Sequence, residues 1–375
     1  MDNSSYLEIR SLFNKFLKHD YWKKYTAADI FFIHDILKNK DSFLTFIDSF
    51  YGDSFGIQFF NNRDGFNYVH DIFTSEAPEY LTVSECDSIC AVYVSKSELK
   101  SDEIAYLKKR ELRIKAENNL IIYRFKKGYS MSLASLSDER KIFKAIELLD
   151  SILRNDLEIV DMSFKEDLCA YVDVDTSRLE YTLIPRPLPF LEKISKRKEC
   201  NLAIVDELSN VGFINDDAYL FTSYLPITIK EDLLRPLAVY LIYPKLNKHY
   251  FSYIIDKPRA YTDKLLAIIY DAFTTIGKPV SLTISSRDSY SILANTLKAL
   301  SIENRVDKNK CTKYDGIHNM LAKFYTEELC DIEISLNEAI ELLNSMALTI
   351  NNSDYDSDDE MDYDIDEDNS NLMVS

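Results

Sequence analysis

The amino-acid sequence predicts an α/β or α+β protein with two domains, each a mixed sheet with helices, and a disordered acidic C-terminal tail. Strand-like apolar runs alternate with amphipathic helical stretches along most of the 375 residues. Three prolines, Pro185, Pro187 and Pro189, interrupt this pattern once. Residues 354–368 hold ten acidic side chains and no basic one. The length of 375 residues allows two domains that each bury a core, and a hydrophobic content of 46% is typical of a globular protein.

The first domain, residues 1–190, begins with two expected helices. In SSYLEIRSLFNKFLKH the apolar residues recur at steps of three and four, which is typical of an amphipathic helix. AADIFFIHDILKN, residues 27–39, favours a second helix. Strand-then-helix patterns follow three times, in 52–73, 86–99 and 118–155, and in the last of these Ser137 is the expected helix N-cap. LCAYVDVDTSRLEYTLI indicates a hairpin that closes the domain.

The second domain, residues 191–350, opens less clearly, with strand-like runs in NLAIVDEL and AYLFTSYL. Two strands around a Pro-Lys-Leu-Asn-Lys turn then occupy residues 236–256, and a helix over 263–277 ends at Gly277. VSLTIS predicts a strand, residues 286–300 a helix, IENRVD a short strand and residues 314–325 a last helix. The order β-β-α-β-α-β-α indicates a mixed sheet with helices on its faces.

Several of these blocks are similar to an uncharacterised bacterial family with two domains. The run from LLRPLAVYLIYP through GKPVSLTISSRDSYSILANTLKALSIENRV to YDGIHNMLAKF resembles that family's C-terminal domain, which is thought to be RNase H-like. GDSFGIQFFNNRDGFNYV, CDSICAVYVSKSELKSDEIAYLKKREL and YRFKKGYSMSLASLSDERKIFKAIELLDSIL resemble three blocks of its N-terminal domain. The resemblance covers about residues 20–325 and implies no known function.

An RNase H-like scaffold raises the question of two-metal nuclease chemistry. Enzymes of that architecture hold two metal ions with carboxylates, the leading one in the first strand. Taking LAVYLIYP as that strand, the sequence offers no carboxylate there, and Asp256 and Asp288 lie at the end of a strand and the start of a helix. We therefore expect no metal site and no catalytic residues of this kind. A divergent hydrolase or nucleic-acid-processing enzyme without the usual first-strand carboxylate stays the alternative.

Other catalytic signatures are missing from the sequence. No glycine-rich phosphate loop, His-Glu-x-x-His or Gly-x-Ser-x-Gly motif occurs, and seven glycines leave little material for a nucleotide-binding loop. We expect no cofactor. Cys86 and Cys90 have no second pair of zinc ligands beside them and are interpreted as small buried residues. The only basic concentrations, SKRK, KKREL and FKKGY, are interpreted as solvated faces, so nucleic acid is not an expected partner.

The polar run that follows VSLTIS is the one candidate ligand rim. Ser285, Ser286, Arg287 and Asp288 come at the carboxyl end of a predicted strand, where open sheets bind ligands. This expectation is an analogy at the level of the fold. The same four residues also suit a simple strand-to-helix turn.

The acidic tail, residues 351–375, should be disordered because its charges repel one another and offer little to bury. Ten of the chain's net −18 charges lie in residues 354–368, which leaves −8 for the rest. Interleaved Tyr355, Met361, Tyr363 and Ile365 also suit docking on a basic protein partner. No apolar run is long enough for a membrane span, and the start lacks the pattern of a signal peptide, so we expect a cytoplasmic protein. A non-catalytic interaction or regulatory role is the favoured function.

Overall fold

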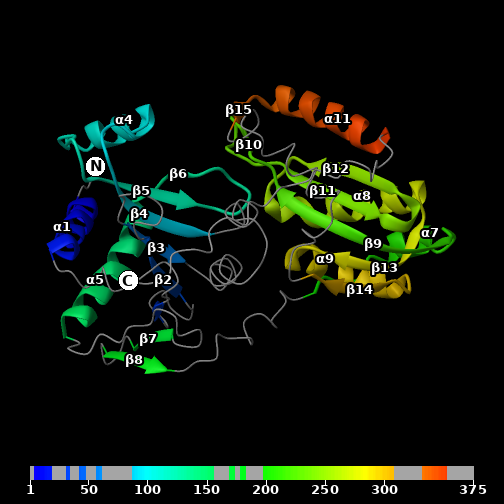
Figure 1. The fold of residues 1–375 in the computed structure, drawn as a ribbon, viewed down its shortest axis with the longest axis horizontal. Helices are drawn as coiled ribbons and strands as arrows, with labels where there is room; N and C mark the ends of the chain where they lie inside the picture. Colours follow the sequence, from blue (N-terminus) through cyan, green and yellow to red (C-terminus); the bar gives the residue numbers. More distant parts are fainter. Residues whose placement is uncertain are drawn as a thin grey trace, which may run out of the picture.

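The computed structural model describes residues 4–18, 31–33, 42–47, 56–60, 87–155, 169–173, 178–182, 197–307 and 332–352. It shows a mixed α/β protein, as predicted, with an eight-stranded sheet, a five-stranded sheet and a pair of short strands (Figure 1). The predicted helix over 314–325 and residues 353–375 of the predicted tail lie outside the described residues, whereas Asn351 and Asn352 belong to helix α11 (Leu336–Asn352). The domain limits near residue 190 stay a prediction. No helix in the described ranges has both the length and the apolar composition needed to cross a membrane.

The first sheet has the strand order β6-β5-β4-β3-β2-β1-β7-β8. Neighbouring strands are antiparallel, except that β1 and β7 are parallel. The strands span β1 Phe31–Ile33, β2 Ser42–Ile47, β3 Gly56–Phe60, β4 Ser88–Val94, β5 Asn119–Phe125, β6 Ser132–Leu133, β7 Cys169–Asp173 and β8 Arg178–Thr182. The predicted hairpin of β7 and β8 is confirmed.

In the part of the chain that the structure describes, three helices accompany this sheet: α1 Ser4–Lys18, α4 Ser101–Lys109 and α5 Leu136–Asn155. The apolar stripe of α1, with Tyr6, Ile9 and Phe13, is buried against the same core as Ile142 and Ile146 of α5. Burial of these aromatic and branched side chains is the main stabilising contribution of the domain. The predicted amphipathic helices at these two places are therefore confirmed.

The second sheet has the order β12-β11-β9-β13-β14. Strand β11 is antiparallel to both of its neighbours, β9 and β12, whereas β13 and β14 run parallel to β9. Their bounds are β9 Phe213–Tyr224, β11 Leu237–Tyr243, β12 Lys248–Ile254, β13 Lys278–Ile284 and β14 Glu303–Val306. Short strands β10 (Ile227–Ile229) and β15 (Ile332–Ile334) pair in parallel beside it.

Helices cover both faces of the second sheet. α8 (Tyr261–Thr275) and α9 (Arg287–Ala299) share one core with the odd-numbered residues of β11, such as Val239 and Leu241. α11 (Leu336–Asn352) shares another core with the even-numbered residues, such as Tyr240 and Ile242. Both faces of β11 are thus buried, which explains its uninterrupted apolar run LAVYLIY. A short helix, α7 Leu202–Leu208, lies beside α8 and α9, and 3₁₀ turns occupy Pro244–Leu246 and Pro258–Ala260.

Gly277 joins α8 to β13 as predicted, and its backbone explains why glycine is needed. Its φ of +124° belongs to a region that side chains rarely adopt. A Cβ atom there would also collide with the side chain of Ile214. The predicted helix stop at this residue is confirmed.

The structure corrects four expectations. FFI within AADIFFIHDILKN is strand β1, because its aromatic and branched residues pair with β2 and β7. NLAIVDEL is helix α7, with Asn201 as its N-cap. Ser135, rather than Ser137, begins α5: its hydroxyl accepts the Asp138 N–H at 3.3 Å and donates to the Asp138 carboxylate at 2.7 Å. Beyond these corrections, β2 and α11 lie where the sequence pattern predicts no element, and α11 follows the helix over 314–325 that is predicted as the last one.

The fourth correction concerns the first strand of the second sheet. The sequence pattern assigns that place to LAVYLIYP, but β9 precedes that strand in the chain and is the central strand of the sheet, between β11 and β13. β9 was recognised only in its apolar half, because its first five residues, FINDD, are mostly polar. This correction reopens the carboxylate question, since β9 carries Asp216 and Asp217.

Candidate functional site: a basic face and a domain joint

The predicted ligand rim lies where β13 meets α9, and its residues form the turn between them. Ser285 is buried, and its hydroxyl accepts the backbone N–H of Thr222 in β9 at 2.9 Å. Ser286 is the N-cap of α9 and accepts the N–H of Ser289 at 3.1 Å. The hydroxyl groups of Thr222 and Ser289 complete the cluster at 2.9 Å. These hydroxyls satisfy one another and the helix end, which is a structural role.

Asp288 connects this turn to the first domain. Its carboxylate forms an ion pair with Lys127, which follows β5 of the first sheet. Lys127 lowers the pKa of the Asp288 carboxyl, although burial partly opposes that effect. Arg287, the fourth rim residue, is partly exposed beside it. The structure therefore brings the four predicted rim residues together, but it places them at a joint between the two sheets.

The segment 126–131 forms this joint, which we call the joint loop. Its Tyr129 bridges to Leu234 in an antiparallel β-bridge. Ser130 donates its N–H to the carbonyl of Leu233 at 2.9 Å, and the N–H of Arg235 reaches the carbonyl of Gly128 at 3.0 Å. Backbone hydrogen bonds therefore tie the first domain to the segment that leads into β11.

Gly128 allows this close approach. Its φ is +72°, and a Cβ atom would lie 2.9 Å from the Tyr224 ring and 3.1 Å from Pro258. Only glycine fits both requirements without a shift of its neighbours. The FKKGY cluster was interpreted as a solvated face, and that interpretation misses its contacts with the second domain.

The two aspartates of β9 point to opposite faces of the sheet, as successive strand residues do. Asp216 is fully buried, and its Oδ2 accepts the N–H of Leu246 at 3.1 Å. Asp217 is exposed and accepts hydrogen bonds from Ser281 at 2.6 Å and Lys245 at 3.0 Å. The Ser281 hydrogen bond is the largest cause of a lowered Asp217 pKa, followed by that from Lys245. These two carboxylates do not converge.

Asp256 is held separately, by the N–H of Lys257 at 2.7 Å and by Lys264 at 3.2 Å. Within the described ranges, no three His, Cys, Asp or Glu side chains come together as metal ligands would. A cavity of about 420 Å³ lies at the N-terminus of α4, with Lys100, Asp102 and Glu333 among its lining residues. The buried carboxylate among these lining residues, Glu103, accepts a hydrogen bond from the hydroxyl of Tyr123 at 2.6 Å. This carboxylate therefore has a structural partner, and we do not assign a ligand to the cavity.

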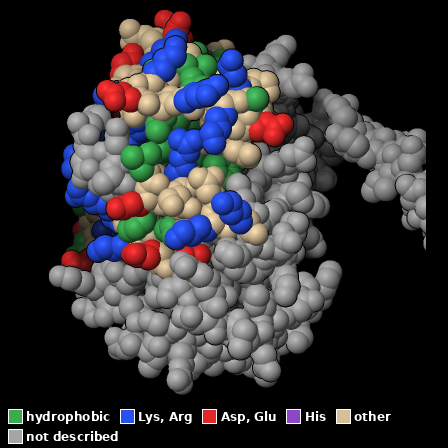
Figure 2. Space-filling view, turned by 90° about the vertical axis from the view of Figure 1, so that its left-hand side faces the viewer, with side chains coloured by type: hydrophobic (Ala, Val, Ile, Leu, Met, Phe, Trp, Pro, Cys, Tyr) green, Lys and Arg blue, Asp and Glu red, His purple; other side chains and the backbone are tan. Residues whose placement is uncertain are grey.

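The first domain presents a different feature, a surface on which basic side chains gather. Figure 2 shows Lys and Arg side chains through the middle of the described surface on the side of α1, α4 and α5, with apolar side chains between them. We call this surface the basic face and define it by the exposed cations of these helices and of the segment after α4. They are Lys15, Lys18, Lys108, Lys109, Arg113, Lys115, Arg140 and Lys144.

Fewer anions accompany these cations. The exposed acidic side chains on the same segments are Glu8, Asp102, Glu111, Glu117 and Glu147. Eight exposed cations against five exposed anions make this surface basic on a chain whose net charge is −18. Such a local reversal of sign favours an acidic partner, because complementary charge steers association.

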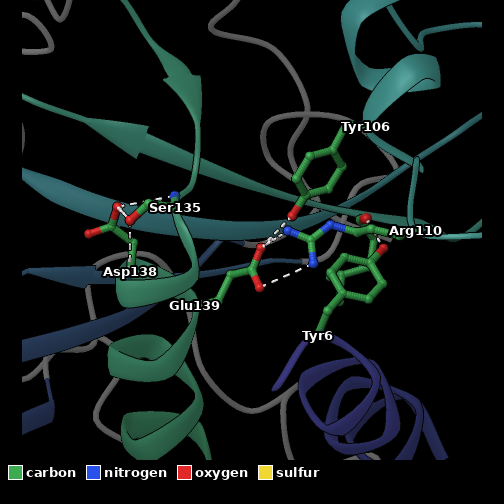
Figure 3. A network of polar contacts seen from close by, with 7 residues as sticks. Tyr6, Tyr106, Arg110, Ser135, Asp138 and Glu139 are labelled. Carbon is green, nitrogen blue, oxygen red and sulfur yellow. Dashed lines mark hydrogen bonds and ion pairs between the residues drawn. The ribbon is translucent and has the colours of Figure 1, made fainter. Parts of the chain in front are cut away.

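A buried polar network joins the three helices beneath the basic face (Figure 3). Arg110, at the C-cap of α4, forms an ion pair with Glu139 of α5, which is fully buried. Tyr106 of α4 donates its hydroxyl to Glu139 at 2.7 Å. The guanidinium also lies 4.3 Å from the Tyr106 ring centroid and 5.1 Å from that of Tyr6 in α1. Each of the three helices, or its cap, thus contributes at least one side chain to the network.

The network has a consequence for the surface above it. Burial raises the pKa of Glu139, and its contacts with Tyr106 and Arg110 oppose that rise. Bidentate contacts and stacking hold a guanidinium in one orientation. The ends of α4 and α5 are therefore fixed relative to α1, which fixes the backbone positions from which the helical cations of the basic face extend.

Sequence reasoning missed this site because its parts are far apart in the chain. KKREL was recognised as a basic cluster, but α1 and α5 add their cations only after folding. Glu139, inside a helical run of charged residues, gave no signal of burial in the sequence.

Comparison with known proteins gives one match. Residues 8–170 match a family described as a domain of unknown function, DUF7309. This agrees with the expected membership of an uncharacterised family, and the matched range includes most of α1 and all of α4 and α5. No curated protein and no solved structure matches the chain.

Proposed function

We propose from the geometry that the chain is a non-catalytic interaction protein of the cytoplasm that binds an acidic partner through its basic face. The family that residues 8–170 match is described only as a domain of unknown function. The single observation that carries this proposal is the exposed, basic surface of α1, α4 and α5 on an otherwise acidic chain. The buried Arg110–Glu139 pair supports it, because a fixed arrangement of charges loses less entropy on binding.

The second domain supports the non-catalytic part of the proposal. We propose that it is RNase H-like, since three antiparallel strands with two parallel strands beside the first give the expected order. At the carboxyl ends of the adjacent strands β9 and β13, Thr222 and Ser285 present hydroxyls that bond to protein groups. The joint loop lies next to this edge, with Lys127 paired to Asp288. These contacts suit a scaffold that positions the first domain.

The binding test uses fluorescein-labelled polyglutamate as the probe and fluorescence anisotropy as the readout. The face-reversed variant carries Lys108→Glu, Lys109→Glu and Arg113→Glu. The matched control carries Lys230→Glu, Lys248→Glu and Lys298→Glu. These three lysines are exposed in the second domain, so both variants change the net charge by the same amount.

We expect the face-reversed variant to bind the probe about tenfold or more weakly, since three exposed attractive pairs of up to about 1 kcal/mol each become repulsive. The control should bind like the native protein. Equal loss in both variants would show that only net charge matters and would remove the basic face as the binding site.

One observation favours a second candidate, a divergent nucleic-acid-processing enzyme. The central strand β9 does carry carboxylates, contrary to the strand assignment made from sequence. Labelled single-stranded and duplex oligonucleotides incubated with Mg²⁺ or Mn²⁺ test it. Under the main proposal no cleavage occurs. Cleavage by the native protein that disappears in Asp216→Asn, Asp217→Asn or Asp256→Asn would establish the enzyme instead.

A further inference from the structure

We infer that the basic face binds the acidic segment 354–368 of a second copy of this chain, so that the protein associates with itself through its tail. This inference rests on the proposed function, because it names the partner of the same surface. Three observations carry it: the match in charge, the match in apolar content, and the position of the helix from which the tail starts.

The charges of the two surfaces are complementary. Residues 354–368 offer ten carboxylates, and the basic face offers eight exposed cations. Paired alone, each exposed cation and carboxylate contributes little, but many such pairs on one short segment add to an appreciable attraction. The helices fix the backbone positions of most of these cations, so the acidic segment bears most of the backbone ordering cost of binding.

The apolar residues match as well. Tyr355, Met361, Tyr363 and Ile365 are spaced among the carboxylates of the segment. On the first domain, Leu7 of α1 is 49% exposed. Three more apolar side chains on α4 and on the segment after it pack against the core of the domain and stay partly exposed, namely Ile104, Leu112 and Ile114.

This composition favours an acidic peptide over a nucleic acid. A nucleic-acid surface is strongly and continuously basic, because affinity comes mainly from phosphate contacts. The basic face is interrupted by five exposed carboxylates and by apolar side chains. The net charge of −18 adds repulsion towards a phosphate backbone.

The position of α11 favours a second copy over the same chain. The end of α11 is fixed to β12, since Asn351 accepts the N–H of Phe251 at 2.6 Å and donates to its carbonyl at 3.1 Å. In Figure 1 this end lies on the far side of the second domain from α1, α4 and α5. The acidic segment starts at Asp354, two residues after α11 ends, so no linker precedes it. Its first carboxylates therefore start far from the chain's own basic face.

The test mixes two full-length variants that each lack one half of the contact. The tail-neutral variant has the ten acidic residues of 354–368 replaced by their amides and keeps its basic face. The face-reversed variant, Lys108→Glu with Lys109→Glu and Arg113→Glu, keeps its tail. Sedimentation velocity at an ionic strength of about 0.1 M, where the screening length is about 10 Å, measures the mass of each protein and of their mixture. Melting temperatures confirm that both variants fold.

We expect the native protein to self-associate as its concentration rises, each variant alone to stay monomeric, and the mixture to form a complex. The matched control with Lys230→Glu, Lys248→Glu and Lys298→Glu should replace the native protein without loss of association. A mixture that stays monomeric overturns the inference. Polyglutamate binding by the tail-neutral variant then decides the proposed function separately: retained binding keeps that function, and absent binding removes both.

Two further outcomes would also overturn the inference in a specific way. A monomeric native protein that binds polyglutamate about tenfold more weakly than the tail-neutral variant would mean that the tail covers its own basic face. An oligonucleotide that binds the basic face more tightly than a synthetic peptide of residues 354–368 would assign the surface to nucleic acid.

Discussion

Replacing Arg110 by methionine removes the guanidinium from the network beneath the basic face and keeps a long apolar side chain against the rings of Tyr6 and Tyr106. Glu139 is fully buried and would keep only the Tyr106 hydroxyl among the contacts described above. A buried charge that loses its partner costs about 3–5 kcal/mol of the free energy of unfolding. We therefore expect Arg110→Met to destabilise the first domain by that amount, measured by urea denaturation followed by circular dichroism.

Two control variants test whether the loss of stability comes from the unpaired buried charge of Glu139. The double variant Arg110→Met with Glu139→Leu should recover most of the loss, because no charge is then left buried. Lys264→Met breaks the exposed pair with Asp256, at 3.2 Å, and should cost less than about 1 kcal/mol. An Arg110→Met variant as mildly affected as Lys264→Met, or a double variant worse than the single one, would refute the reasoning.

Three other variants test the joint and the turn beside it. Gly128→Ala should cost at least about 1–2 kcal/mol, because alanine is strained at φ +72° and its Cβ would lie 2.9 Å from the Tyr224 ring; faster proteolysis between the domains is the readout, and an unchanged rate would contradict it. The ion pair with Lys127 lowers the pKa of the Asp288 carboxyl in the folded protein. The small contribution of this pair to the free energy of unfolding is therefore fully present above the unfolded-state pKa of about 3.9, and it is lost as the pH falls through the folded-state pKa. The native protein should therefore lose slightly more stability on acidification than Asp288→Asn, by less than about 1 kcal/mol because the pair is partly exposed, and identical pH profiles would show no contribution. Ser285→Ala leaves a buried backbone N–H of β9 without its acceptor and should cost about 1–3 kcal/mol in thermal unfolding, whereas an unchanged melting temperature would mean that this hydrogen bond is not needed.

Most elements with a strong period could be predicted from the sequence. β11 and β12, α8, β13 and α9 all lie where the pattern of apolar residues and turn residues placed them. Helix α11 is an exception, because it spans 17 residues and no helix is predicted there. The other failures came where the pattern was short or mixed. FFI was absorbed into a helical pattern because its pairing partners, β2 and β7, lie far away in the chain.

The error at β9 had the larger effect on function. Its polar first half, with Asp216 and Asp217, gives no strand signal, and only its pairing with β11 and β13 makes it the central strand. The candidate site shows the same limit. The cations of α1, α4 and α5 share one surface because Tyr6, Arg110 and Glu139 hold the three helices together. A local sequence pattern does not predict such contacts between distant segments.

The joint loop also affects how a small molecule could bind at the edge of the second sheet. Open sheets offer a crevice beyond the carboxyl ends of their strands, and here Lys127 pairs with Asp288 at that edge while Gly128 packs against Tyr224. A ligand in that crevice would therefore compete with the docking of the first domain. By thermodynamic linkage, such a ligand would separate the domains, and mutations that loosen the joint would tighten its binding to the same extent.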